Sequence, residues 1–229
     1  MSALTFTLKA FTLKDSLAHP IDCSLLTPNH LANLSISEIE HLSLLNTKNS
    51  AKVGDYFDIS GTDSNHIIFD NTSQQLNHIG HQMTRGQISV EGNCGDFLGR
   101  QMRGGTIICH GSANDRVGDQ MRRGLILIDG NAGDYCGSRM VAGTIGVFGN
   151  VGNYTAYAMK RGTILLTQKP NLHATMQDCG THNLPFLSLL FASFQALPTK
   201  FKSISSLRVQ RFAGDLACNG NGEILICSD

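Results

Sequence analysis

A step of 19 residues recurs through the middle of the sequence and constrains the fold more than any other feature. Glycine, methionine and isoleucine each return at this step. The three columns are Gly80, Gly99, Gly118 and Gly137 with Ala156 in the fifth place; Met83, Met102, Met121, Met140 and Met159; and Ile88, Ile107, Ile126, Ile145 and Ile164. Columns in such strict register are typical of proteins built from stacked repeats.

Each repeat is too short for two helices and a turn, and its frequent glycines destabilise any helix. Apolar Ile88 and Val90 alternate with polar neighbours, and the same places in later repeats are also apolar. This alternation predicts one short strand per repeat with a buried face. A step of 19 is not a multiple of six, which counts against a left-handed hexapeptide helix. The sequence therefore predicts a mainly β fold, a right-handed parallel β-helix with 19-residue coils.

Glycine has a clear use in such coils, because each corner needs a residue that accepts a positive φ. One corner is marked by Gly92-Asn93, Gly111-Ser112, Gly130-Asn131 and Gly149-Asn150. The small residues that follow this corner are Cys94, Ala113, Ala132 and Val151. They fit a crowded interior position, so we interpret Cys94 as a packing residue.

Atypical segments flank the repeats, as expected for a stack whose open ends need cover. Residues 1–52 are expected to form an N-terminal cap, with a strand at 6–9 and a helix near 35–45 that begins with a Ser35–Glu38 capping box. Residues 53–168 are expected to form the glycine-rich β-helix, whose degenerate first coil spans 53–71 with Gly54 and Gly61 as turns. Residues 169–229 supply a helix at 184–197 and a tail with a strand at 223–226. Short α-helical segments would thus cap both ends.

Outward strand positions of the later repeats are apolar, namely Leu125, Leu127, Phe148 and Leu165. A row of exposed apolar side chains usually marks a contact. We expect another subunit or the chain's own C-terminal helix to cover this face.

Composition narrows the classes of function. The 18 basic and 18 acidic residues cancel, which argues against a nucleic-acid partner held by bulk charge. The longest apolar run, near 184–197, is too short to span a membrane, and the first 20 residues lack the pattern of a signal peptide. Seven cysteines without a CxxC pair indicate reduced thiols, so a cytoplasmic location is expected.

Residues that could carry chemistry are few. The sequence has no identifiable catalytic triad and no nucleotide-binding glycine loop. His78 and His81 lack a third metal ligand nearby. The acidic column at Asp96, Asp115 and Asp134 fits Asx turns better than a calcium site. We therefore expect no catalytic residue, no metal and no cofactor on this chain.

Basic residues gather at one corner of the coils, soon after each methionine. They are Arg85, Arg103, Arg122, Arg123, Lys160 and Arg161, a set that we call the basic strip. Stacked like charges destabilise each other, so an anionic surface or chain lying against them would explain the strip. The competing interpretation is a corner that long side chains keep soluble.

The glycine-rich coils resemble the β-helix shared by the C-terminal domain of glutamate synthase large subunits and the C subunit of formylmethanofuran dehydrogenase. The flanking segments are similar to those of the dehydrogenase, and this similarity extends over nearly the whole chain. The stretches that carry it are Leu26-Thr27-Pro28 and residues 34–39 (LSISEI), 53–61 (VGDYFDISG), 211–216 (RFAGDL) and 220–225 (GNGEIL).

The resemblance implies a non-catalytic subunit of a one-carbon enzyme complex, and a charged content of only 16% favours its bacterial form. Such a complex passes a formyl group from formyltetrahydromethanopterin to a methanofuran-type carrier and hydrolyses it to formate. Its other chains would be an amidohydrolase-like, a formyltransferase and a dehydrogenase-B-like subunit. The basic strip would then meet a partner's carboxylates or the carrier's glutamate-rich arm.

Other functions stay open at this point. The chain could be the C subunit of a molybdenum or tungsten formylmethanofuran dehydrogenase, or an amidotransferase β-helix that helps to shape an ammonia channel. A polysaccharide-active β-helix is the weakest alternative, because clustered acids in one groove and long loops are missing from the sequence.

Overall fold

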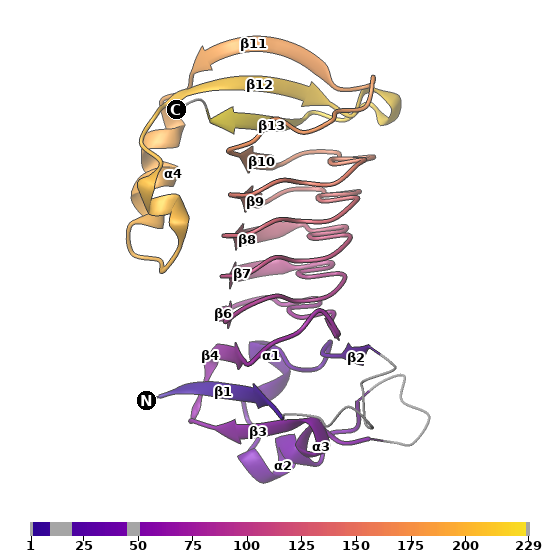
Figure 1. Ribbon diagram of the computed structural model, residues 1–229, viewed down its shortest axis with the longest axis vertical. Coiled ribbons are helices and arrows are strands. Elements are labelled where there is room, and N and C mark those ends of the chain that lie inside the picture. Colours follow the sequence, from indigo (N-terminus) through magenta and orange to yellow (C-terminus); the bar gives the residue numbers. More distant parts are fainter. Residues whose placement is uncertain (1, 10–19, 45–50, 228–229) are drawn as a thin grey trace.

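The computed structural model describes residues 2–9, 20–44 and 51–227, and most of its strands join one long sheet (Figure 1). The sheet has 11 strands in the order β11-β12-β13-β10-β9-β8-β7-β6-β4-β1-β3. Their bounds are β1 Ala3–Leu8, β3 Phe57–Ser60, β4 Asp63–Asp70, β6 Gln87–Val90, β7 Arg103–Cys109, β8 Arg123–Ile128, β9 Thr144–Val147, β10 Thr163–Leu166, β11 Gln177–Asn183, β12 Arg208–Gly214 and β13 Gly222–Cys227. Adjacent strands in the series β1-β4-β6-β7-β8-β9-β10-β13 pair in parallel. The antiparallel pairs lie at the two ends of the sheet, β1 with β3 at one end and β13 with β12 and β12 with β11 at the other. The fold is thus mainly β with a large, mostly parallel sheet, as in a β-helix.

The helices are short and flank this sheet (Figure 1). Their bounds are α1 Pro28–Leu31, α2 Ile36–Glu40, α3 Val53–Tyr56 and α4 Phe186–Phe194, with 3-10 helices η2 at Lys200–Ser203 and η3 at Leu216–Cys218. Two further strands, β2 Ile21–Asp22 and β5 Leu76–Asn77, pair with each other in parallel.

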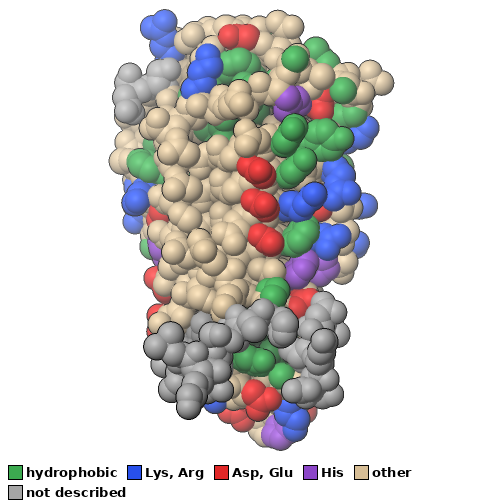
Figure 2. Space-filling view, turned by 45° about the vertical axis from the view of Figure 1, so that its right-hand side comes forward, with side chains coloured by type: hydrophobic (Ala, Val, Ile, Leu, Met, Phe, Trp, Pro, Cys, Tyr) green, Lys and Arg blue, Asp and Glu red, His purple; other side chains and the backbone are tan. Residues whose placement is uncertain are grey.

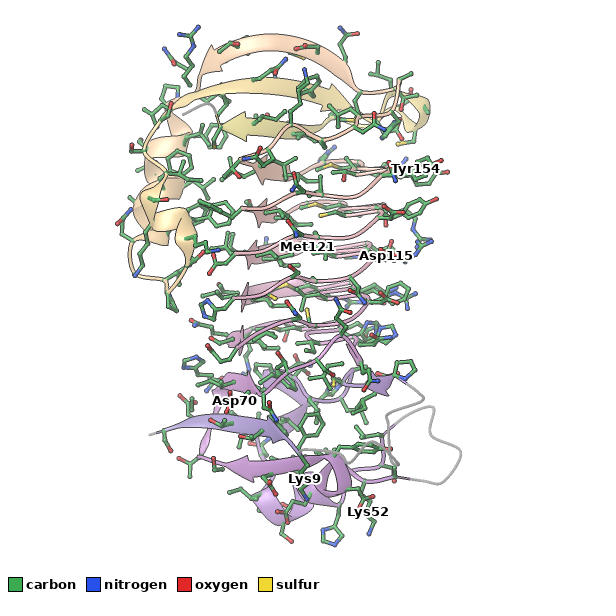
Figure 3. All side chains as sticks on the ribbon, viewed as in Figure 1. Lys9, Lys52, Asp70, Asp115, Met121 and Tyr154 are labelled. Carbon is green, nitrogen blue, oxygen red and sulfur yellow. The ribbon has the colours of Figure 1, made fainter. Side chains whose placement is uncertain are left out.

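Equivalent residues of successive repeats pair side by side in the sheet. From β6 to β10, Ile88, Ile107, Ile126, Ile145 and Ile164 form one continuous row. All five side chains are fully buried, as are the five repeat methionines. The prediction that these columns fill the interior is confirmed, and Met121 lies within the stack in Figure 3.

The glycine column is explained by the isoleucine of the following repeat. Gly118 has a φ of +62°, and a Cβ atom added to it would overlap Cδ1 of Ile145. The other glycines of this column meet the corresponding isoleucine in the same way. Ala156 keeps a positive φ of +65° in the fifth place, and the isoleucine row continues beyond Ile164 to Ile224 of β13. The glycine and isoleucine columns are thus two halves of one packing arrangement.

Polar side chains link the repeats at the outer corner. The Asn93 side-chain oxygen accepts a 2.8 Å hydrogen bond from the backbone N–H of Ser112. In the acidic column, Asp96 accepts from the N–H of Asp115 at 3.2 Å, and Asp115 accepts from that of Asp134 at 2.8 Å. The expectation of local Asx turns in this column was therefore wrong. Because the repeats stack in strict register, the backbone N–H of the next repeat lies within hydrogen-bond distance of each carboxylate, and the carboxylate accepts from that N–H.

The small residues at the interior corner pack as predicted. Cys94, Ala113 and Ala132 are buried, and each is paired in parallel with its equivalent in the next repeat. The packing interpretation of Cys94 is confirmed.

The strand before the first regular repeat belongs to the same sheet. β4 pairs in parallel with β6, and Ile67 extends the isoleucine row. Gly61 forms a turn with a φ of +94°. Gly54 does not form a turn, because it lies inside α3, where Asp55 accepts a 2.7 Å hydrogen bond from the N–H of Lys52 and stabilises a helical start.

The predicted capping box is present at the start of α2. The N–H of Ser35 donates to Glu38 at 2.8 Å, and the N–H of Glu38 donates to the Ser35 hydroxyl at 3.3 Å. The helix ends at Glu40, earlier than predicted, since the chain turns at His41 so that Ser43 can bridge to the segment before α3. The strand predicted at 6–9 is β1.

The apolar outward face of the later repeats is covered by the C-terminal part of the chain. Leu127 and Leu165 are fully buried in a second core with Phe194 and Phe201. Phe148 meets Phe201 edge to face, with 5.8 Å between ring centroids. The prediction of a cover is confirmed, and the cover is α4 with η2, which lie along the side of the sheet (Figure 1). The predicted helix at 184–197 is thus α4, and the predicted tail strand is β13.

Asp129 fastens this cover to the sheet. Its carboxylate is 5% exposed and accepts hydrogen bonds from the Thr199 hydroxyl at 2.7 Å and the Lys200 N–H at 2.8 Å. Its second oxygen lies 3.0 Å from Nδ1 of His110. A buried carboxylate with several donors is well satisfied, so it holds η2 against the end of β8.

Candidate functional site

The basic strip runs beside the strands, and all six of its side chains are exposed. Arg103 and Arg123 are paired neighbours in β7 and β8, so like charges stand side by side. Lys160 donates a 3.1 Å hydrogen bond to the carbonyl of Cys218. Within the described ranges, no carboxylate forms an ion pair with any member of the strip. The strip is therefore exposed and without ion pairs among the described residues, with a gap at Val141 in the fourth repeat.

A second surface lies on the turn side of the repeats and consists of one residue per repeat. Its members are His78, Phe97, Arg116, Tyr135 and Tyr154, and each has a positive φ between +57° and +64°. His78 stacks on Phe97 with centroids 4.8 Å apart, and Tyr135 stacks on Tyr154 at 5.0 Å. The Arg116 guanidinium joins the two pairs, 5.9 Å from the Phe97 ring and 4.7 Å from that of Tyr135. The result is a continuous stack of rings around one cation.

This stack was missed by sequence reasoning, although its members recur at the same step of 19. A histidine, a phenylalanine, an arginine and two tyrosines share no side-chain class, so the column gives no obvious pattern. Only the stacking of their planar groups relates them. Figure 3 places Tyr154 and Asp115 on the same side of the stack, and Figure 2 shows basic, acidic and hydrophobic side chains gathered there.

A buried carboxylate lies between two arginines next to the stack and hydrogen-bonds one of them. Asp119 is fully buried, and Nη2 of Arg139 donates to its two oxygens at 2.9 and 3.0 Å. The Ser138 hydroxyl also donates to Asp119, at 2.7 Å. Nε of Arg100 is 3.6 Å from the same carboxylate, and the Arg100 guanidinium lies 5.0 Å above the Phe97 ring. The hydrogen bonds with Asp119 fix Arg139 in orientation, since a forked guanidinium pairs with a carboxylate in one geometry.

A hollow of about 370 Å³ opens on this surface between Arg116, Tyr135, Arg139, Tyr154 and Tyr157. We call these five residues the tyrosine–arginine face. Tyr154 and Tyr157 are 50% and 48% exposed, and Tyr157 stands edge-on to Tyr135 at 5.9 Å. The face can bind planar and anionic groups, but its side chains include no nucleophile paired with a base.

The two histidines singled out in the sequence lie at the start of the stack, with ring centroids 5.8 Å apart. Burial lowers the pKa of His78 and His81 below 6.5, and for His81 the charge of His78 acts in the same direction. In the part of the chain that the structure describes, no group of three His, Cys, Asp or Glu residues could hold a metal ion. We therefore assign the pair to the aromatic stack.

The buried thiols are poor nucleophiles. Burial raises the pKa of Cys136 to about 12. The Cys94 sulfur lies 3.9 Å from that of Cys109, and this contact together with burial raises the pKa of Cys94 well above its usual range. Thiols held protonated in this way react slowly at neutral pH.

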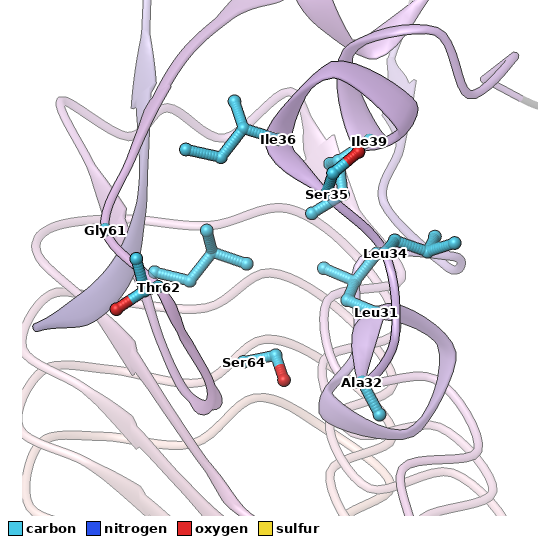
Figure 4. Close-up of a pocket in the computed structure, with 10 residues that line it drawn as sticks. Leu31, Ala32, Leu34, Ser35, Ile36, Ile39, Gly61, Thr62 and Ser64 are labelled. Atoms are coloured by element: carbon cyan, nitrogen blue, oxygen red, sulfur yellow. The ribbon is translucent and has the colours of Figure 1, made fainter. Parts of the chain in front are cut away.

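A smaller hollow of about 190 Å³ lies near α1 and α2 (Figure 4). Its ten lining residues, which include Leu31, Leu34 and Ile39, contain no acid, base or thiol. This hollow can hold an apolar group but cannot perform acid–base chemistry.

No model of a known protein family matches the sequence, but individual known proteins do. The C subunit of tungsten-containing formylmethanofuran dehydrogenase 2 is 32% identical over 88 residues in Methanococcus maripaludis and 34% identical over 87 residues in Methanothermobacter wolfeii. The Fhc C subunit of the formyltransferase/hydrolase complex from Methylorubrum extorquens is 30% identical over 86 residues. These alignments cover 36–38% of this chain and 32% of each relative, so the chain matches about a third of the length of its curated relatives.

A solved structure matches over a much longer range. It is the crystal structure of the formyltransferase/hydrolase complex (FhcABCD) from Methylorubrum extorquens in complex with methylofuran. The matching chain is 26% identical, with a TM-score of 0.67, over 98% of this chain and 100% of that chain.

The described segments contain no helix that combines the length and the apolar character needed to cross a membrane. The sequence matches and the structural match agree with the resemblance carried by the repeats and flanking motifs. The chain is therefore similar in sequence to the C subunits of formylmethanofuran dehydrogenase and of the Fhc complex, and similar in fold to a chain of the FhcABCD complex.

Proposed function

We propose that this chain is a non-catalytic, structural subunit of a formyltransferase/hydrolase complex. Such a complex would convert formyltetrahydromethanopterin to formate through a methanofuran-type carrier in the cytoplasm. The observation that carries the proposal is the match to a chain of the FhcABCD complex over 98% of this chain and all of the other. The scarcity of paired nucleophiles and bases described above fits a chain without a catalytic site of its own.

The architectural part of the proposal is a right-handed parallel β-helix with 19-residue coils over residues 53–168. Residues 1–52 would cap its first coil, and residues 169–229 would pack on it and close the other end. Supporting this, the sheet contains repeat strands flanked by antiparallel pairs at both ends. Caps of this kind keep a stack of repeats from extending by edge-to-edge pairing.

The partners in this proposal are an amidohydrolase-like, a formyltransferase and a dehydrogenase-B-like subunit. The basic strip would lie against carboxylates of one partner or against an anionic part of the carrier. Its unpaired arginines, stacked in register, support this role because opposite charge relieves their mutual repulsion. The chain itself would hold neither carrier nor tetrahydromethanopterin in a reactive position.

The test is co-expression of the chain with the other subunits encoded by its organism. A stable complex that releases formate from the formylated carrier is expected, and a chain that stays apart from those subunits refutes the proposal. In the assembled complex, the triple variant Arg103→Ala, Arg122→Ala and Arg123→Ala should weaken assembly or raise the apparent KM for the carrier. Lys202→Ala is the control, because Lys202 is an exposed cation on η2, outside the strip. Unchanged assembly and kinetics in the triple variant would remove the strip from the proposal.

A second candidate is the C subunit of a tungsten-containing formylmethanofuran dehydrogenase, favoured by the names of the relatives from Methanococcus maripaludis and Methanothermobacter wolfeii. The same co-expression decides between them. A purified complex that contains tungsten or molybdenum and oxidises the formylated carrier would favour the dehydrogenase.

A further inference from the structure

We propose that the tyrosine–arginine face is a docking surface for a segment of a partner subunit that presents one carboxylate side chain next to an apolar one. This inference rests on the proposed function, because it requires that the chain works inside a complex. The face is distinct from the basic strip, and none of the relatives' names assigns it a role.

The first reason is that the face is organised before any partner binds. Arg116 is held between two rings, and Tyr135 packs against both Tyr154 and Tyr157. Nη2 of Arg139 is fixed by both oxygens of Asp119. Side chains that are already ordered lose little conformational entropy on association, so the surface is suited to binding.

The second reason is an available guanidinium at the centre of the face. Its planar surface is stacked, which leaves the N–H edge free to donate. Among the described residues, no carboxylate forms an ion pair with Arg116. A guanidinium presents a fork that matches a carboxylate in a two-pronged geometry, so a glutamate or aspartate side chain is the complementary group.

The third reason is the exposure of large rings beside that guanidinium. Tyr154 and Tyr157 are half exposed, and the 370 Å³ hollow between them and the arginines has room for side chains of a partner. Tyrosine and arginine are the residues that most often dominate the binding energy of protein interfaces. We infer that the partner places an apolar or aromatic side chain against the tyrosines next to its acidic one.

The neighbouring acidic column argues for a polypeptide and against a nucleic acid. Asp96, Asp115 and Asp134 run beside the stack, and Asp115 is exposed. A phosphate chain carries a charge on every unit and would be repelled along the whole column, whereas a polypeptide can bring one carboxylate to Arg116 and place uncharged residues beside the column. The net charge of zero also argues against a nucleic-acid partner.

The experiment measures assembly of the full complex with variants of this chain. Arg116→Glu and the double variant Tyr154→Ala, Tyr157→Ala should each raise the dissociation constant of the chain by about 10- to 100-fold, as expected for central interface residues. Arg116→Lys keeps the charge but loses the fork, so a smaller loss is expected. Lys202→Glu is the control with the same change of charge on another surface, and it should leave assembly unchanged.

The melting temperature of each isolated variant separates binding from folding. If Arg116→Glu unfolds early, the comparison rests on Arg116→Lys and on Tyr154→Phe, which keeps the stacked ring and should assemble normally. Wild-type assembly together with unaffected variants would overturn this inference and leave the proposed function standing. A wild-type chain that fails to assemble would overturn both.

Discussion

Gly118→Ala gives a direct test of how the repeats pack. The new methyl group would overlap Cδ1 of Ile145 and would sit on a residue with a φ of +62°. The left-handed backbone costs an L-residue about 1–2 kcal/mol, and overpacking a core costs about 1–3 kcal/mol. Together they predict a loss of about 2–5 kcal/mol in the free energy of unfolding. The melting temperature should fall by about 5–20 °C.

Two further variants separate the backbone from the steric contribution. Gly180→Ala changes a glycine in β11 with a φ of +82° and no atom within 4 Å of the added Cβ, so it measures the backbone cost alone. Ile145→Val removes Cδ1 and should cost about 0.5–1.5 kcal/mol by itself. Combined with Gly118→Ala, it should recover most of the steric loss, because the overlapping atom is gone.

The assay is chemical and thermal unfolding followed by far-ultraviolet circular dichroism. The double-mutant cycle should show a favourable coupling between Gly118→Ala and Ile145→Val, since each substitution compensates for the other. The packing explanation would be refuted if Gly118→Ala and Gly180→Ala lowered stability equally, or if Ile145→Val added its own loss in full.

Two other perturbations test the C-terminal cover and the start of the aromatic stack. Asp129→Asn should lower the free energy of unfolding by about 3 kcal/mol, because it removes the charge that accepts hydrogen bonds from Thr199 and Lys200. Hydrogen exchange at the Lys200 amide should accelerate, and an unchanged rate would contradict the anchoring role. Burial holds the pKa of His78 and His81 below 6.5, so their neutral forms favour the fold above that pH, and this stability is lost as the pH falls through the lowered pKa values. The melting temperature should therefore drop on acidification below pH 6.5 less steeply in His81→Gln than in the wild type, and parallel pH curves would exclude His81 as a cause.

Much of the interior could be predicted from the sequence because one step of 19 repeats the same environment. Ile126 and Met121 face the core in their repeat for the same reason as in every other repeat. The apolar outward positions likewise predicted a cover, and Leu127 and Leu165 are indeed buried. The identity of that cover stayed open, because periodicity inside the repeats carries no information about a segment outside them.

The candidate surfaces were predictable to different degrees. The basic strip was visible because six like charges occupy the first two positions after the methionines, a pattern of one chemical type. The stack through Phe97, Arg116 and Tyr135 was not, because its members differ in type and are related only by ring planes in contact. The turn predicted at Gly54 was also wrong. A glycine by itself indicates a turn, but Gly54 lies in α3, and the start of that helix is stabilised by the hydrogen bond from the N–H of Lys52 to the Asp55 carboxylate.

The sequence alone determined that repeats stack, which columns fill the core, and where glycine is required, since each follows from a period that equals one structural unit. Only the tertiary structure decided that the acidic column bonds across repeats, that α4 covers the sheet, and that planar side chains join into one face. Those outcomes depend on distances between residues far apart in the chain, and neither local propensity nor periodicity encodes such distances.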